Sequence, residues 1–218
     1  MPYEFVPRSG YQPFREEVET IIKKVQNLVR DYFTFQFKIV GSGNRNGKPL
    51  IMREIDGNKG FDLDYNLILN NPDADHIWNP DFAKKTLMKA FDEAIKGTMF
   101  DHPEDSTTSI TIKVKDPKHS RILRSVDFAV VYYPEDEEYS YYKYVRFNKR
   151  KGNYTWEVRK SSYAAEENLR WLKDNIDGYW MDIKEEYKHL KNVNHDPNKH
   201  SFQLYFEAIN NVYSHWAN

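Results

Sequence analysis

One segment of the sequence limits the possible folds more than any other, because it carries two opposed patterns. From Phe61 to Leu69 the residues are typical of a β-strand, in which alternate side chains point to opposite faces. Asp62 and Asp64 therefore lie on one face, whereas Leu63 and the apolar residues at every second position after it lie on the other. The sequence thus predicts a strand with one apolar face and one acidic face.

The rest of the chain alternates between helical and strand patterns. Apolar residues recur every three or four positions from Phe14 to Phe33, which predicts an amphipathic helix with Pro13 in its first turn after an irregular lead-in. A second helix is expected from Asn79-Pro80 to Gly97. The expected strands are 34–40, 61–69, 110–115, 122–133, 139–147 and 153–158, and residues 43–60 are expected to form a loop or a hairpin.

Helices dominate the end of the chain. One long helix is expected from Ser162 to about Leu190, and another from about His200 to Trp216, with Pro197 in the break between them. Strands in the middle followed by helices indicate an α+β fold, with a core over residues 1–160 and a helical part over residues 161–218.

Composition excludes several classes of protein. The 32 Lys and Arg residues nearly balance the 33 Asp and Glu residues, so a broad nucleic-acid-binding surface is not expected. The absence of Cys excludes disulfides and thiolate chemistry. The first ten residues lack an apolar signal core, and no apolar run approaches the ~18 residues of a membrane span, so we expect a cytoplasmic protein without membrane contact.

A third carboxylate adds weight to the acidic pair. Asp62 and Asp64 side by side repel each other, a cost that a fold accepts most readily when a cation neutralises both. Asp127 is an acid within an otherwise apolar strand, where removal of a charge from water needs compensation. Hard cations such as Mg²⁺ prefer oxygen ligands, and two-metal phosphoryl chemistry uses such carboxylates. The alternative is that Asp62 and Asp64 are solvated charges on the surface of a strand.

The strand before the acidic pair ends in a turn, Gly41-Ser42-Gly43. Glycine lets a ligand approach the main chain, the Ser42 hydroxyl can contact a phosphate oxygen, and backbone N–H groups in such a turn can bind an anion. The turn is not a P-loop, because no Gly-Lys-Ser/Thr follows it.

Taken together, these segments resemble the DNA polymerase β-like nucleotidyltransferase superfamily. The resemblance runs through Val40-Gly41-Ser42, the stretch from Phe61 to Leu67 and the stretch from Ser125 to Val130. The later stretch from Tyr154 to Val158 is similar to the corresponding part of oligoadenylate-synthetase-like members and bacterial cyclic-oligonucleotide-synthase-like members.

The resemblance implies a mixed β-sheet nucleotidyltransferase core with flanking helices and a short helical C-terminal part packed on it. It implies transfer of a nucleoside monophosphate from a nucleoside triphosphate such as ATP to an acceptor hydroxyl, with release of pyrophosphate. The cofactor would be Mg²⁺ or Mn²⁺, and the acceptor is left open among a nucleotide, an RNA end, an antibiotic and a protein. The roles implied are metal binding and catalysis for Asp62, Asp64 and Asp127, and nucleotide binding for Gly41, Ser42, Arg170 and Lys173.

Two other functions remain open from the sequence. The chain could be a non-catalytic module of the same fold that binds a nucleotide or RNA. It could also be an interaction protein, such as one half of a toxin–antitoxin pair, with its acids on a solvated face.

Overall fold

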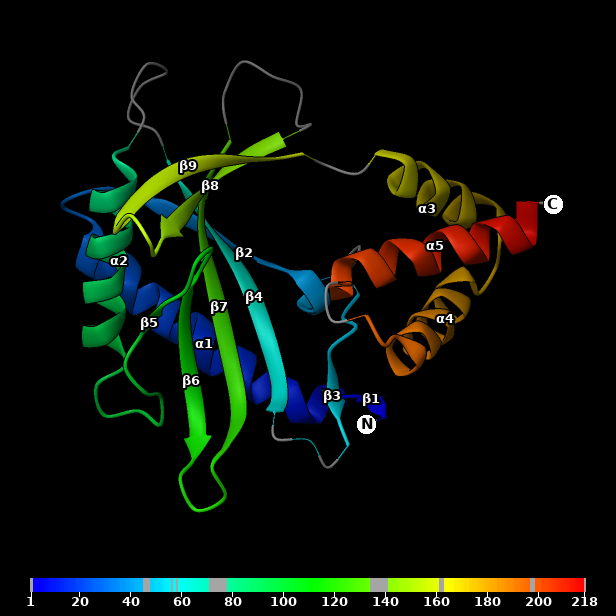
Figure 1. The fold of residues 1–218 in the computed structure, drawn as a ribbon, viewed down its shortest axis with the longest axis horizontal. Helices are drawn as coiled ribbons and strands as arrows, with labels where there is room; N and C mark the ends of the chain where they lie inside the picture. The colour runs from blue at the N-terminus through cyan, green and yellow to red at the C-terminus, as the bar shows by residue number, and fades with distance from the viewer. Residues whose placement is uncertain are drawn as a thin grey trace. The chain divides into compact units, whose positions relative to one another are not determined.

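The structure is a computed structural model that describes residues 2–44, 48–55, 57, 59–70, 78–133, 141–160, 163–196 and 199–217 (Figure 1). It divides into two compact units. The sheet unit comprises Val6–Ile51 and Asn58–Lys160, and the helical unit comprises Met1–Phe5, Met52–Gly57 and Ser161–Asn218. Among the described residues, no helix is both long enough and apolar enough to cross a membrane.

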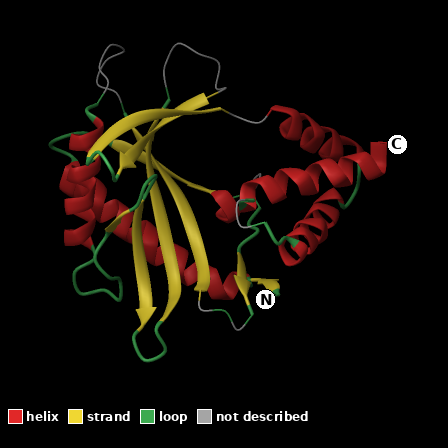
Figure 2. Ribbon diagram, viewed as in Figure 1, coloured by secondary structure: helices red, strands yellow, loops and turns green. Residues whose placement is uncertain are grey.

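In the sheet unit a helix is followed by strands, then by a second helix and by further strands. They are α1 (Arg8–Val29), β2 (Phe35–Val40), η1 (Gly41–Gly43), β4 (Lys59–Leu69), α2 (Pro80–Ala94), β5 (Glu104–Asp105), β6 (Ile110–Asp116), β7 (Arg121–Tyr132), β8 (Tyr141–Asn148) and β9 (Asn153–Lys160). The expected α+β class is confirmed by this combination of helices and a mixed sheet (Figure 2).

The sheet has β4 and β7 at its centre. Its order is β2-β4-β7-β6-β5, and β7 also pairs with β8, which in turn pairs with β9. The central pair β4-β7 is parallel, whereas β2, β6 and β8 run antiparallel to the strands they join. The two central strands therefore run in the same direction through the middle of the sheet, so their side chains can be compared position by position.

Both long helices of the sheet unit pack on one face of the sheet. On α1, Phe14 packs edge to face with Phe61 of β4 at 5.6 Å between ring centroids. On α2, Phe91 stacks on Phe128 of β7 at 4.3 Å. The Tyr65 hydroxyl of β4 donates to a carboxylate of α1 at 3.2 Å. These contacts bury the apolar face that the alternating pattern predicts for β4.

The first helix begins earlier than expected. Pro13 was expected in its first turn, but α1 starts at Arg8 and Pro13 is the sixth helical residue. The backbone N–H groups of Gly10 and Tyr11 both donate to the carbonyl of Pro7, which closes an additional turn, and burial of Tyr11 adds to its stability. The second helix begins as expected, because the Asn79 side chain accepts from the N–H groups of Asp81 and Phe82.

The helical unit corrects a second expectation. It contains β1 (Tyr3–Phe5), β3 (Met52–Glu54), α3 (Tyr163–Asn175), α4 (Tyr179–Val193) and α5 (Ser201–Ala217). The single helix expected up to Leu190 is wrong, because the chain turns between α3 and α4 at Gly178, whose φ of +80° favours glycine. The last helix agrees with the expected range.

The segment expected as a loop or hairpin contributes a strand to this unit. β3 pairs antiparallel with β1, from Tyr3 opposite Glu54 to Phe5 opposite Met52. Other parts of the expected pattern lie outside the described residues, namely 45–47, 56 and 58 in this segment, 71–77, 139–140 and Pro197.

The stacked contact between α2 and β7 provides a test of the core. Replacement of Phe91 by Ala should lower the free energy of unfolding by about 3–5 kcal/mol, because Phe91 is fully buried and its removal leaves a cavity. Phe82→Ala on the same helix is the control, since Phe82 is 42% exposed and should lose much less. Equal losses in urea denaturation of the two variants would contradict this assignment of the core.

Candidate active site on the acidic face of the sheet

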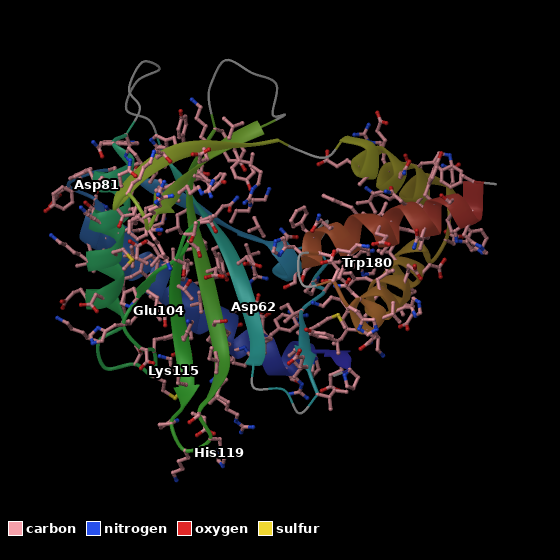
Figure 3. All side chains as sticks on the ribbon, in the orientation of Figure 1. Asp62, Asp81, Glu104, Lys115, His119 and Trp180 are labelled. Carbon is pink, nitrogen blue, oxygen red and sulfur yellow. The ribbon has the colours of Figure 1, made fainter. Side chains whose placement is uncertain are left out.

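The register of the two central strands brings the three predicted acids together. Asp64 of β4 lies opposite Asp127 of β7, and Asp62 lies opposite Ser125. Residues paired across neighbouring strands point to the same face, and neighbouring strands are about 4.8 Å apart. Asp62, Asp64 and Asp127 therefore share one face of the sheet, opposite the face that α1 and α2 cover. We call this the acidic face, and Figure 3 labels Asp62 on it.

The acids differ in their surroundings. Asp62 is exposed, whereas Asp64 and Asp127 are half-buried. One oxygen of Asp127, Oδ1, accepts hydrogen bonds from the hydroxyls of Ser109, at 3.1 Å, and Thr111. Both bonds reach Oδ1 and fix the orientation of this carboxylate. Neither of them involves Oδ2.

The Gly-Ser turn lies directly against the second acid. Val40, the last residue of β2, pairs with Asp64, and η1 follows at once. Gly41 has a φ of +60°, and a Cβ atom at this position would lie 2.2 Å from Oδ2 of Asp64. No other residue type fits there without displacing the carboxylate. Ser42 accepts the Leu50 N–H at 2.7 Å through its carbonyl oxygen. The expected contact of its hydroxyl with a phosphate remains a prediction.

A cleft opens beside two of the acids. Its volume is about 470 Å³, and it is lined by Gly60, Phe61, Asp62, Ser106, Thr108, Ser109, Thr111, Lys113, Ile122, Ser125 and Asp127. The lining is mostly polar, and the ammonium of Lys113 within it forms an ion pair with Glu104. A polar cleft with carboxylates on one wall suits a charged ligand better than an apolar one.

The residues can be tested for their fit to a magnesium ion. Within the described part of the chain, no three His, Asp or Glu side chains are gathered closely enough to hold a metal ion as they stand. The donor chemistry fits, because all three acids offer the carboxylate oxygens that Mg²⁺ prefers. The strand register fits as well, since Asp64 and Asp127 are direct neighbours. The donor chemistry and the strand register of the acidic face are thus compatible with such an ion.

Two of the residues expected to bind nucleotide belong to the helical unit. Arg170 and Lys173 lie on α3, three residues apart and both exposed. Side chains three apart on a helix are neighbours on its surface. They form one basic position on α3, and their expected contact with a triphosphate remains a prediction.

Sequence reasoning missed the groups that hold Asp127. Ser109 and Thr111 are among the few buried polar residues of the described chain, at 8% and 6% exposure. Thr111 alternates with Ile110 and Ile112 along β6, a position that the sequence alone assigns to a solvated face. The sequence does contain a hydroxyl residue, Thr111, within an apolar strand. Its position beside Asp127 follows only from the pairing of β6 with β7.

Comparison with known proteins shows the fold and no more. No family model matches the chain, and no curated protein matches its sequence. Among solved structures, it is similar to the cyclic AMP-GMP synthase DncV of Vibrio cholerae, with a TM-score of 0.57 and 11% identity over 86% of this chain and 61% of that one. It is also similar to the c-di-GMP synthase CdnE of Capnocytophaga granulosa, with a TM-score of 0.58 and 18% identity over 98% of this chain and 64% of that one.

These likenesses confirm the resemblance stated from the sequence at the level of the fold. The chain therefore shares the fold of these two cyclic-dinucleotide synthases over most of its length. The chain spans less than two thirds of the length of either neighbour. Activity therefore has to be argued from the residues of the acidic face.

The Gly41 contact leads to a prediction with a matched control. Gly41→Ala and Gly152→Ala both place a side chain at a positive φ, +60° and +65°, which costs about 1–2 kcal/mol. At Gly152 nothing lies within 4 Å of the new Cβ, whereas at Gly41 it meets the Asp64 carboxylate. Gly41→Ala should therefore lower the free energy of unfolding by a further 1–3 kcal/mol or so, the usual cost of overpacking.

Urea denaturation of the two variants and the wild type measures this difference. If the two alanine variants lose the same free energy, the turn does not press against Asp64, and the proposed contact is absent in solution.

Proposed function

We propose that this chain is a divalent-metal-dependent nucleotidyltransferase that moves a nucleoside monophosphate from a nucleoside triphosphate to an acceptor hydroxyl. The observation that carries the proposal is the register of β4 and β7, which sets Asp64 beside Asp127 and Asp62 next along the same face. Like charges this close raise the free energy of the fold unless a cation shares them. The Gly41 turn beside Asp64 and the fold shared with the two synthases support the same reaction class.

The reaction forms one bond and breaks one. The acceptor oxygen attacks the α-phosphorus of the triphosphate, and the bond from that phosphorus to the oxygen shared with the β-phosphate breaks. The electron pair of that bond leaves with pyrophosphate, and the proton of the acceptor hydroxyl passes to a base. A bound Mg²⁺ pair would supply charge neutralisation at the phosphates and lower the pKa of the acceptor hydroxyl.

The chain's own residues divide the remaining tasks. Asp62 and Asp64 would hold the metal ions when these are bound, and Asp127 would hold an ion on the acceptor side and help to activate the acceptor hydroxyl. The Ser109 and Thr111 hydroxyls keep Asp127 in place through Oδ1. Gly41 and Ser42 contact the β- and γ-phosphates through the turn. For Arg170 and Lys173 of the helical part, residues 161–218, the resemblance of the sequence to the superfamily is what supports a role in triphosphate binding, and residues 1–160 carry the chemistry.

The acid residues lead to a direct test. The full-length chain is incubated with Mg²⁺ and the four ribonucleoside triphosphates, with and without RNA as an acceptor, and products are identified by mass spectrometry while pyrophosphate is measured. Wild type should release pyrophosphate and form a nucleotidyl product. Asp64→Asn and Asp127→Asn should each lower the rate by at least about 10²-fold, the usual effect of losing one charge-stabilising group at a reacting centre.

A control variant distinguishes the effect of losing a carboxylate of the site from the effect of losing any carboxylate. Asp31→Asn removes one carboxylate from an exposed position after α1 and should leave the rate unchanged. If wild type and Asp64→Asn are equally inactive with every triphosphate and acceptor class, the enzyme proposal fails. Calorimetry then decides between the alternatives: Mg²⁺-dependent nucleotide binding without product indicates a binding module, and no affinity for either indicates an interaction protein.

A further inference from the structure

One lysine occupies a position where lysine is unusual. Lys84 on α2 is 1% exposed, and among the described residues it is the only Lys, Arg, Asp or Glu that is buried. Its neighbour Lys85 is exposed and forms an ordinary ion pair with Asp81 one turn away. A charged side chain is rarely fully buried unless specific partners surround it, so the partners of Lys84 indicate its role.

The three oxygen atoms that face the Lys84 ammonium come from one short segment. Its Nζ donates to the backbone carbonyls of Ser106 and Ser109, both at 2.9 Å. It also lies 3.0 Å from Oδ1 of Asp105, as an ion pair. An ammonium has three protons to donate and finds three oxygens here. The segment from Asp105 to Ser109 connects β5 to β6, so Lys84 ties this connection to α2.

The segment that binds Lys84 also contacts Asp127. Ser109 accepts from Lys84 through its carbonyl and donates to Asp127 through its hydroxyl. Ser106 shares a hydrogen bond of 2.8 Å with the Thr111 hydroxyl, which itself donates to Asp127. Two short paths therefore lead from the buried ammonium to Asp127 Oδ1. Ser106, Ser109 and Thr111 all line the cleft beside Asp62 and Asp127.

Asp105, which lies at the end of these hydrogen bonds away from Asp127, is held in place as well. The Tyr154 hydroxyl of β9 donates to Oδ2 of Asp105, the carboxylate oxygen that does not face Lys84. Burial, and then the hydrogen bond to Asp105, raises the pKa of Tyr154, so its hydroxyl keeps its proton and acts as a donor. Asp105 is thus held between β9 and α2, and the segment that follows it has little freedom to move.

Burial of this charge costs the fold stability. Burial lowers the pKa of Lys84 below its usual value, and the nearby carboxylates of Asp105 and Asp127 oppose that effect without cancelling it. The folded state therefore holds this proton less tightly than the unfolded chain does. Apolar residues can replace a whole buried ion pair with no loss of stability, whereas removal of one partner alone is strongly destabilising. A buried lysine that costs stability therefore indicates a role beyond packing.

We propose that Lys84 is a positioning residue for the site on the acidic face. It holds the connection between β5 and β6 so that Ser109 and Thr111 present their hydroxyls to Asp127 Oδ1 and leave Oδ2 for the metal and the acceptor. The inference rests on the proposed function, because it assigns Lys84 a role in the reaction through Asp127.

The test compares Lys84→Met with Lys85→Met as the matched control. Lys84→Met should lower kcat by about 10-fold, within the range for a misplaced catalytic group. It should leave the KM for the triphosphate within twofold. Loss of one partner of a buried ion pair should lower the midpoint of thermal unfolding, so kcat is measured well below that midpoint. Lys85→Met should change none of these quantities. A kcat equal to that of wild type in Lys84→Met overturns the proposal.

A double-mutant cycle with Ser109→Ala shows whether the effect passes through Ser109. Groups that act through one another give losses that do not multiply. We expect Ser109→Ala to lower kcat by a similar factor, and the double variant to lose little more than either single one. Multiplied losses overturn the proposed path. If Lys84→Met does not fold, the double variant Ser109→Ala/Thr111→Val decides, because it removes both hydroxyls that donate to Asp127 Oδ1, and a wild-type kcat in it overturns the proposal.

A measurement without turnover separates this inference from the proposed function. Mn²⁺ affinity of the full-length chain, measured by water-proton relaxation, should fall several-fold in Lys84→Met and Ser109→Ala and stay constant in Lys85→Met. If wild type makes a product but Lys84→Met alters neither kcat nor Mn²⁺ affinity, only the role of Lys84 is overturned. If wild type makes no product yet Lys84→Met weakens Mn²⁺ binding, the enzymatic function fails and Lys84 still positions Asp127.

Discussion

The parallel pairing of β4 with β7 is the constraint on which the rest of the sheet unit depends. Through it, each strand presents one apolar and one polar face in the same register, so that Leu63 lies beside Val126 and Asp64 beside Asp127. A shift by one residue would place the carboxylates under α1 and α2 and the apolar side chains on the opposite face. The burial of rings such as Phe91 against Phe128 therefore fixes the positions of the acids as firmly as it fixes the core.

The acidic face works against the stability that the core provides. Repulsion between neighbouring carboxylates and the buried charge of Lys84 each raise the free energy of the folded chain. These features gather around one cleft and its supporting connection, whereas the helix-covered face shows regular apolar packing. Departures from the rules of stable folding are expected where a binding or reacting site is built.

The sequence predicted those parts of the site that depend on local periodicity. Asp62 and Asp64 share a face because a strand has a period of two, and no tertiary information is needed for that. The place of Asp127 follows from the β4-β7 register, which the sequence does not contain, although an acid in an apolar strand was a usable signal. The break at Gly178 was missed because the apolar pattern continues across it and hides the left-handed residue.

Lys84 shows why the supporting residues were harder to find. On α2, the apolar Phe82 is 42% exposed and Lys84 is buried, because the buried stripe of this helix runs through Lys84, Leu87, Phe91 and Ala94. Periodicity alone assigns a lysine to the solvent-exposed face of a helix, because its charge is buried only where a partner offsets the cost of desolvation. Besides the Asp105 carboxylate, the partners of Lys84 are two backbone carbonyls, 22 and 25 residues further along the chain. A carbonyl is present in every residue and leaves no mark in a sequence, so a charge that it stabilises becomes visible only when the fold is known.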